Sequence, residues 1–290
     1  MPPATFTYRQ LNRDYAYWTE RRCIGVQKGG HVCGLLSQRT DDGGVQNILI
    51  DCGLGTLEAI ADFCPDEFWD QPLAVFITHG HIDHHAELMV LSEIYCTRRG
   101  DLHSKRPPLP VFCTEPTYRH LERTHWYGFH GGDTLAFHPL IPGLPHVHSP
   151  FRITPVPTDH FEGAVFLVFD FPPGHRLLIA WDITTPPSDL TALRRPSLTL
   201  VDATTWCALK EWTTHAGLEE LVSSGFLHGL ELVYAPDQQQ YGAWLVHYSG
   251  LEDPWGMLTD ADLKARLDAA WPHLAALVRI AARGQVWEFE

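Results

Sequence analysis

Four histidines and one aspartate stand within eight residues of this chain, in the stretch THGHIDHH at positions 78–85. Imidazole and carboxylate together suit divalent Zn, Mn or Fe. His79 and His81 are two residues apart, so on an extended segment both side chains point to one side and can reach one ion. Asp83 and His84 are adjacent and point in different directions, which suits a second ion beside the first. The stretch therefore predicts a dinuclear metal site.

Two ions about 3.5–4 Å apart can hold a bridging hydroxide and can also polarise a phosphoryl or carbonyl oxygen. A carboxylate that bridges both ions would complete such a site. The alternative interpretation is a solvated surface loop, which would suit a single histidine. The spacing of this motif directly after an apolar strand favours metal binding instead. His85 falls outside the pattern, and we expect it to begin the next helix.

Short apolar runs bounded by Gly, Pro or Asp recur along the chain and predict the strands that would position this loop. The runs are 47–53, 73–78, 151–157, 164–171, 176–182, 198–204 and 243–250. Helical periodicity falls in 54–64, 85–95, 216–224 and a long stretch that follows Thr259. Pro272 is expected to split this last helix and Gly284 to end it, before a final strand at 285–290. Strands mixed with helices predict a layered α/β fold.

Several predicted strands run directly into a residue of a metal-ligand type. These residues are His79, His160, Asp182 and His247. Residues at the carboxyl ends of strands converge on one rim of a sheet, where α/β proteins tend to build their sites. We therefore expect these four side chains to meet.

The motif His79-Gly-His81-Ile-Asp83-His84 resembles the signature of the metallo-β-lactamase-fold hydrolases. That family implies an αββα sandwich with a dinuclear metal site on one edge. NILIDCG resembles the early strand of the family, which implies that Asp51 supports the metal loop. The later motifs follow in the family's order, and the resemblance covers about residues 45–250.

Carried over residue by residue, the resemblance implies seven metal ligands that hold two divalent ions, Zn or Mn, with Fe as a further option. One ion would be held by His79, His81 and His160, the other by Asp83, His84 and His247, with Asp182 between them. Asp83 is also counted among the catalytic residues. All seven positions are filled, which argues against an inactive relative.

The stretch TTHAGLEELVSSG at 213–225 carries a lone histidine, His215, that opens a helix. Together with residues 202–204, it resembles the phosphodiesterase branch, which includes tRNase Z and the cyclic-phosphate phosphodiesterase of the carbon–phosphorus lyase pathway. There the matching histidine helps the leaving oxygen depart. The resemblance implies in-line attack on phosphorus by a metal-bridging hydroxide, with His215 as general acid or transition-state stabiliser. The plainer interpretation is a helix N-terminal histidine without a role.

The bulk composition limits the partners. The net charge of −14 disfavours extended nucleic acid, and the Gly/Pro-rich arm of tRNase Z is not recognisable. A small phosphodiester, such as a cyclic nucleotide or another cyclic phosphate, is the preferred substrate. Seven cysteines without regular spacing, no signal-like N-terminus and no long apolar run predict a cytoplasmic protein without membrane contact. Because proteins of the family that this sequence resembles often form dimers, a homodimer is an alternative to a monomer.

We expect a single domain over residues 1–290, with a loop-rich insertion at about 97–150. The insertion could cover the site, because it carries four basic residues within 98–106 and three aromatic residues within 126–129. These are Arg98, Arg99, Lys105, Arg106, Trp126, Tyr127 and Phe129. A solvated loop with its aromatic residues packed down is the favoured interpretation.

The fold alone does not set the substrate. A same-fold hydrolase of a carbon ester, lactone or lactam would use the same metals and would not need His215. A tRNase Z-like nuclease, a di-iron oxidoreductase and a non-catalytic or biosynthetic accessory protein are further alternatives. Failure to bind two metal ions would support the accessory protein.

Overall fold

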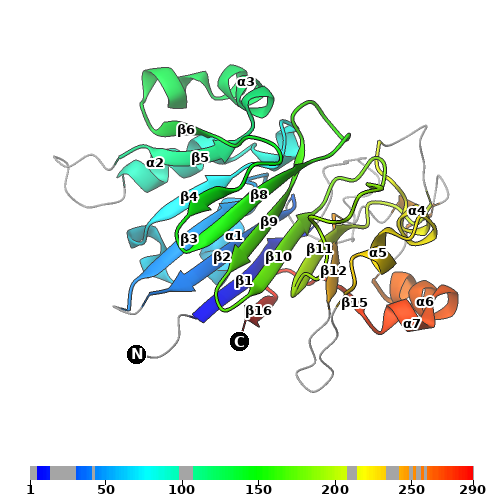
Figure 1. Ribbon diagram of the computed structural model, residues 1–290. Coiled ribbons are helices and arrows are strands. Elements are labelled where there is room, and N and C mark those ends of the chain that lie inside the picture. The colour runs from blue at the N-terminus through cyan, green and yellow to red at the C-terminus, as the bar shows by residue number, and fades with distance from the viewer. Residues whose placement is uncertain are drawn as a thin grey trace.

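The structure, a computed structural model, describes most of the chain in seven stretches, together with the backbone of two short strands. The stretches are 5–13, 31–40, 43–97, 107–207, 214–232, 242–247 and 260–289. The short strands, β13 (Leu251–Glu252) and β14 (Gly256–Met257), form a small sheet of their own. Two larger sheets lie face to face with helices on their outer sides, as Figure 1 shows. The predicted αββα sandwich is confirmed.

The first sheet joins the N-terminal half of the chain to the last strand, in the order β16-β1-β2-β3-β4-β5-β6. Its strands are β1 (Thr5–Asn12), β2 (Cys33–Arg39), β3 (Val45–Ile50), β4 (Leu73–Phe76), β5 (Leu109–Cys113), β6 (Leu135–Pro139) and β16 (Val286–Phe289). Strands β3 to β6 are parallel, so the carboxyl ends of β3 and β4 lie at the same edge.

The second sheet has the order β15-β12-β11-β10-β9-β8-β7. Its strands are β7 (His146–His148), β8 (Phe151–Pro157), β9 (Val165–Phe171), β10 (His175–Ala180), β11 (Leu198–Asp202), β12 (Ala243–Val246) and β15 (Val278–Ile280). Strands β10, β11 and β12 are parallel neighbours. Their carboxyl ends therefore also meet at one edge of the sheet.

The core has three layers, one between the sheets and one outside each. Ile48 and Ile50 of β3 face the layer between the sheets, whereas Leu49 faces the outer layer beneath the first sheet's helices. Successive strand residues point to opposite faces, and both faces are buried here. This explains why the central strands are continuous apolar runs in the sequence.

In the part of the chain that the structure describes, helices cover the outer faces of both sheets (Figure 1). Three pack beside the first sheet and four beside the second. They are α1 (Thr56–Phe63), α2 (Leu88–Thr97), α3 (Glu115–Thr124), α4 (Leu218–Ser223), α5 (Phe226–Gly229), α6 (Asp260–Ala270) and α7 (Pro272–Ala275). Single helical turns are formed by η1 (Asp66–Asp70), η2 (Ile82–His84) and η3 (Tyr127–Gly131). Among the described residues, no helix is long and apolar enough to cross a membrane.

The expectation of a loop-rich segment at 97–150 is wrong for residues 107–150. This part contains β5, α3, β6 and β7, and so extends both sheets by their edge strands. The buried side chains of Leu109, Val111, Leu121 and Leu135 anchor it in the outer layer of the first sheet. Helix α3 was missed because its sequence is mostly polar and only its inner face is apolar. The four basic residues at 98–106 lie outside the described residues. The expectation that the aromatic residues pack down is wrong for Trp126 and Tyr127, which are exposed.

Two further details differ from the sequence-based expectation. Pro272 does split the C-terminal helix, as predicted, and begins α7. The helical segment ends before Val278, however, and Gly284 belongs to the turn that leads into β16, with a φ of 79°. Strands β1 and β2 had not been expected, and α2 begins at Leu88, after His85.

Candidate metal centre

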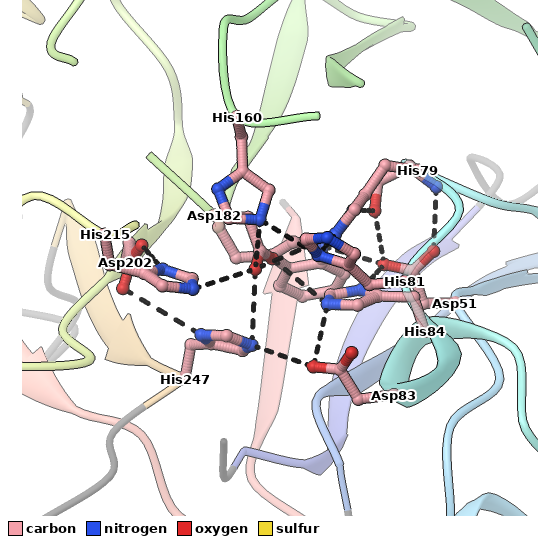
Figure 2. A network of polar contacts seen from close by, with 12 residues as sticks. Asp51, His79, His81, Asp83, His84, His160, Asp182, Asp202, His215 and His247 are labelled. Atoms are coloured by element: carbon pink, nitrogen blue, oxygen red, sulfur yellow. Dashed lines mark hydrogen bonds and ion pairs between the residues drawn. The ribbon is translucent and has the colours of Figure 1, made fainter. Parts of the chain in front are cut away.

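The structure brings all seven predicted ligands together with His215. Figure 2 shows the carboxylate of Asp182 surrounded by imidazole rings. Its Oδ1 lies 3.4 Å from Nε2 of His247, 3.6 Å from that of His160, 3.7 Å from that of His215 and 4.0 Å from that of His79. Its Oδ2 lies 3.3 Å from Nε2 of His84. These residues follow strands of both sheets, so the centre straddles one edge of the sandwich.

The first ligand set, His79, His81 and His160, has the geometry of three ligands on one ion. His81 Nδ1 lies 2.9 Å from His79 Nε2 and 3.2 Å from His160 Nε2. Two nitrogens bound tetrahedrally to zinc at about 2.05 Å are separated by about 3.3 Å. The observed separations are close to this value, so the three nitrogens fit a single ion.

The second ligand set, Asp83, His84 and His247, fits a second ion. Asp83 Oδ2 lies 3.4 Å from His84 Nε2 and 3.7 Å from His247 Nε2. Among the described residues, His84 Nε2 and Asp182 Oδ2 are buried without a hydrogen-bond partner. Buried polar atoms in native proteins are nearly always satisfied. Two such atoms facing each other among ligand-type side chains are expected where a cation binds.

Two buried aspartates, Asp51 after β3 and Asp202 at the end of β11, orient the histidines by the same pattern of contacts. Asp51 accepts hydrogen bonds from the backbone N–H and the hydroxyl of Thr78, at 2.8 and 2.7 Å. Asp202 accepts the same pair from Thr204, at 2.8 and 2.6 Å. Each aspartate also contacts one histidine Nδ1, that of His84 at 2.7 Å or that of His215 at 2.6 Å.

This pattern fixes which nitrogen of His79 and His247 faces the centre. Since the Thr78 hydroxyl donates to Asp51, it accepts from His79 Nδ1–H at 3.1 Å. Since the Thr204 hydroxyl donates to Asp202, it accepts from His247 Nδ1–H at 2.9 Å. Both rings then present a lone pair on Nε2. Partners of this kind are what set tautomer and ring orientation at metal sites.

Burial keeps the first ligand set uncharged. It lowers the pKa of His79 and His81, and it lowers the pKa of His160 to about 4. Neutral imidazole is the form that binds metal ions. For His215, burial alone would lower the pKa, but the carboxylates of Asp202 and Asp182 outweigh it and raise the pKa. His215 is therefore electrostatically distinct from the first ligand set.

Three residues of the centre have left-handed backbone conformations, which residues other than glycine rarely adopt. Asp51, Asp182 and His247 have φ values of 57°, 65° and 60°. Asp51 directly follows β3 and His247 directly follows β12, whereas Asp182 is the second residue after β10. All three lie at the edge where the centre is built. Left-handed backbone of this kind costs free energy and is typical of functional sites.

Replacing Asp51 by alanine is expected to lower the free energy of unfolding by about 3 kcal/mol or more. Asp51 is fully buried and also accepts a hydrogen bond from Trp181 Nε1–H at 2.8 Å, so the change leaves four buried donors without an acceptor. Urea denaturation of the metal-free protein measures the loss. A change below about 1 kcal/mol, the scale of a single ordinary hydrogen bond, would contradict this prediction.

Replacing Gly53 by alanine is expected to displace the metal loop. A Cβ at this position would lie 1.8 Å from the carbonyl oxygen of Asp83 and 2.5 Å from Cβ of His31. Backbone must therefore move, and overpacking of this kind costs about 1–3 kcal/mol. The expected results are a lower unfolding midpoint in urea and weaker zinc binding in a chelator competition. Unchanged zinc affinity would show that the loop tolerates the shift.

The sequence had not indicated Thr78, Thr184 or Trp181 as part of the site, and Thr204 had been noted only as part of the motif that resembles the phosphodiesterase branch. His160 Nδ1 lies 3.0 Å from Thr184 Oγ1, so this threonine orients the last histidine of the first ligand set. A usable signal existed, because Thr78 precedes His79 and Thr204 lies two residues after Asp202. The sequence had suggested no role for His103, His120, His125, His130, His138, His146 and His148, and of these His103 lies outside the described residues.

Comparison with known proteins agrees with this fold. A family model described as "Beta-lactamase superfamily domain" matches residues 46–224. The metallo-β-lactamase fold protein YhfI from Bacillus subtilis has a TM-score of 0.70 at 14% identity, with 98% of this chain and 100% of that chain covered. The sequence matches no curated protein.

Two further solved structures are similar over nearly their whole length. Zn²⁺-bound PqqB from Methylobacterium extorquens has a TM-score of 0.66 at 13% identity, covering 98% of this chain and 100% of that one. Unliganded yeast PDE1 has a TM-score of 0.64 at 14% identity, covering 98% and 99%. Identities this low show a shared fold and not a shared reaction. With the family model matching more than half of the sequence, the chain belongs to the beta-lactamase superfamily and has the metallo-β-lactamase fold.

Proposed function

We propose that this protein is a metal-dependent phosphodiesterase that hydrolyses a small phosphodiester. The observation that carries this proposal is the placement of His215. Its Nδ1 is held by Asp202 at 2.6 Å, and its Nε2 faces the centre 3.7 Å from Asp182 Oδ1. A histidine oriented in this way can donate a proton to, or stabilise, an oxygen that leaves the reacting phosphorus.

The residues that would hold two divalent ions, Zn or Mn, are the first and second ligand sets with Asp182 between them. Bound there, the ions would supply a hydroxide nucleophile near neutral pH and neutralise charge on the phosphoryl oxygens. Among the described residues, no lysine or arginine forms an ion pair with Asp51, Asp83 or Asp182.

The side chains of this chain have separate tasks in the proposed reaction. Asp51 and Asp202 fix the orientation of the histidines, so that these need not reorganise as charge develops. Asp83, in the second ligand set, is the carboxylate on the side of the centre next to His84 and His247. His215 is placed on the other side of Asp182 from His84, as Figure 2 shows, where it can serve the leaving oxygen.

The nearest rival is a hydrolase of a carbon ester, lactone or lactam. It would use the same ligand sets. The role of Asp202 would then be limited to orienting His247 through Thr204. The direct contact from Asp202 to His215 favours the phosphodiesterase. For an RNA-processing nuclease, the net charge of −14 is unfavourable, because a polyanion would be repelled.

The test is a substrate panel on metal-free protein reconstituted separately with Mn and with Zn. We expect metal-dependent hydrolysis of bis(p-nitrophenyl) phosphate, little hydrolysis of p-nitrophenyl acetate, a simple lactone or a cephalosporin, and two ions bound per chain. Turnover of the carbon substrates alone, with two ions bound, would overturn the proposal in favour of the rival. Binding of no ions would support the accessory-protein alternative.

A further inference from the structure

A buried pair of histidines outside the two ligand sets connects the metal loop to helix α3. We propose that His85 and His125 are positioning residues for the first ligand set, and that α3 supports this set but not the second. Neither histidine was given a role from the sequence. The inference rests on the proposed metal centre, and its experiment is designed to separate the two.

The contact chain runs from the end of α3 into the middle of the HxH motif. His85 Nε2 lies 3.2 Å from the carbonyl oxygen of Gly80, the residue between His79 and His81. His85 Nδ1 lies 2.9 Å from Nε2 of His125, which caps the C-terminus of α3. Both residues are buried, with 1% of the surface of His85 and 7% of that of His125 exposed.

The chemistry of these contacts determines where the protons are. The carbonyl oxygen of Gly80 only accepts, so His85 Nε2 carries the proton and donates. In a neutral ring, Nδ1 is then the acceptor, and it must receive the proton of His125 Nε2–H. The proton of His125 Nε2 thus points to His85, and the proton of His85 Nε2 points to Gly80, so each ring has one defined orientation. The pair fixes the peptide between two ligands, just as partners of ligand side chains fix the ligands themselves.

Helix α3 also contacts the loop that carries the third member of the first ligand set. Thr114, the N-cap of α3, donates its hydroxyl to the carbonyl oxygen of Gly163 at 2.8 Å. His120, in the middle of the helix, packs its ring on Phe161 with centroids 4.9 Å apart. Phe161 directly follows His160 and packs on His81 at 4.2 Å.

The packing of α3 against Gly80 is close enough to require glycine. A Cβ at Gly80 would lie 2.9 Å from Cβ of His120. Helix α3 therefore reaches the HxH loop directly through His120 and, by way of His85, through His125. It contacts the His160 loop through Thr114 and His120. These are the two loops that supply His79, His81 and His160.

The second ligand set is oriented from elsewhere. His84 Nδ1 is bound by Asp51, and the carbonyl oxygen of His84 accepts from Cys52 N–H at 2.7 Å. His247 is bound by Thr204 in the second sheet. Since none of these partners belongs to α3, loss of the His85–His125 pair should weaken only the ion at the first ligand set.

The experiment measures zinc affinity by chelator competition in two backgrounds, each with one ligand set disabled. In His247→Ala, the remaining ion occupies the first ligand set; in His160→Ala, it occupies the second. Adding His85→Leu is expected to weaken zinc binding about tenfold or more in the first background. Tenfold is about the lower end of the range of affinity losses seen when a supporting contact of a metal ligand is removed. In the second background, the affinity should stay unchanged. Co²⁺ absorption spectra report the altered coordination independently of activity.

Two variants guard against general loss of structure. His85→Gln keeps a donor for Gly80 and an acceptor for His125, so it should restore zinc affinity in the first background. His148→Leu removes a half-buried histidine of β7 that contacts Gln46, and it should leave both affinities unchanged. Equal weakening in both backgrounds, or no weakening in the first, overturns the inference while leaving the proposed function intact. A wild-type chain that binds fewer than two ions overturns the proposed centre, and this inference with it.

Discussion

Replacing Asp182 by asparagine is expected to reduce the rate of phosphodiester hydrolysis at least about a thousandfold. A catalytic ion stabilises the transition state by several kcal/mol, and each loss of about 1.4 kcal/mol slows the reaction tenfold. Five imidazole Nε2 atoms lie within 4.0 Å of this one carboxylate. Asparagine keeps the volume but removes the charge, and its amide nitrogen cannot bind a cation. The number of bound ions should fall from two to one or none.

Metal content after reconstitution and removal of excess ion, together with the rate on bis(p-nitrophenyl) phosphate, measures this effect. Asp170→Asn is a matched control, since Asp170 pairs with Arg176 on the surface of β9 and β10. It should behave as wild type. An Asp182→Asn protein that keeps two ions and wild-type turnover would show that Asp182 does not bridge the ions.

Replacing His215 by alanine is expected to slow hydrolysis of bis(p-nitrophenyl) phosphate about a hundredfold, the scale of a lost general acid. Because Asp202 binds Nδ1 of His215, the other nitrogen is directed at the centre. A diester with an alkoxide leaving group should lose more rate than one with p-nitrophenolate, because an alkoxide depends more strongly on protonation as it leaves. The two bound ions should remain.

Rates on both diesters and the metal content of His215→Ala decide this prediction. His228→Ala, an exposed histidine on α5, is the control and should show no loss. An equal fall on both diesters would indicate stabilisation of charge without proton donation. Loss of an ion would make His215 a ligand, consistent with its place beside His160 and Asp182. An unchanged rate would favour the hydrolase of carbon esters or lactones.

Much of the centre was predictable because its residues follow strands that the sequence reveals directly. Strands buried on both faces are continuous apolar runs, and His79, Asp182 and His247 each come shortly after such a run. Once parallel strands are aligned, their carboxyl ends meet, so order along the chain is enough to predict the meeting of these side chains. The spacing of the ligand-type residues within 79–84 further indicated that His79 and His81 belong to one ligand set and that Asp83 and His84 belong to the other.

The sequence by itself thus indicated most of the central strands and the metal-binding motif, since these depend on local periodicity and short spacing, and the family resemblance implied the seven candidate ligands. Only the tertiary structure decided what orients the ligands. The contact from Asp51 to Trp181 joins residues 130 positions apart, and His85 meets His125 across 40 positions. Helix α3 was hidden because its largely polar sequence gains stability from packing on the first sheet rather than from its own periodicity. Hydrogen bonds between distant loops leave no local pattern, because each partner alone is an ordinary polar residue.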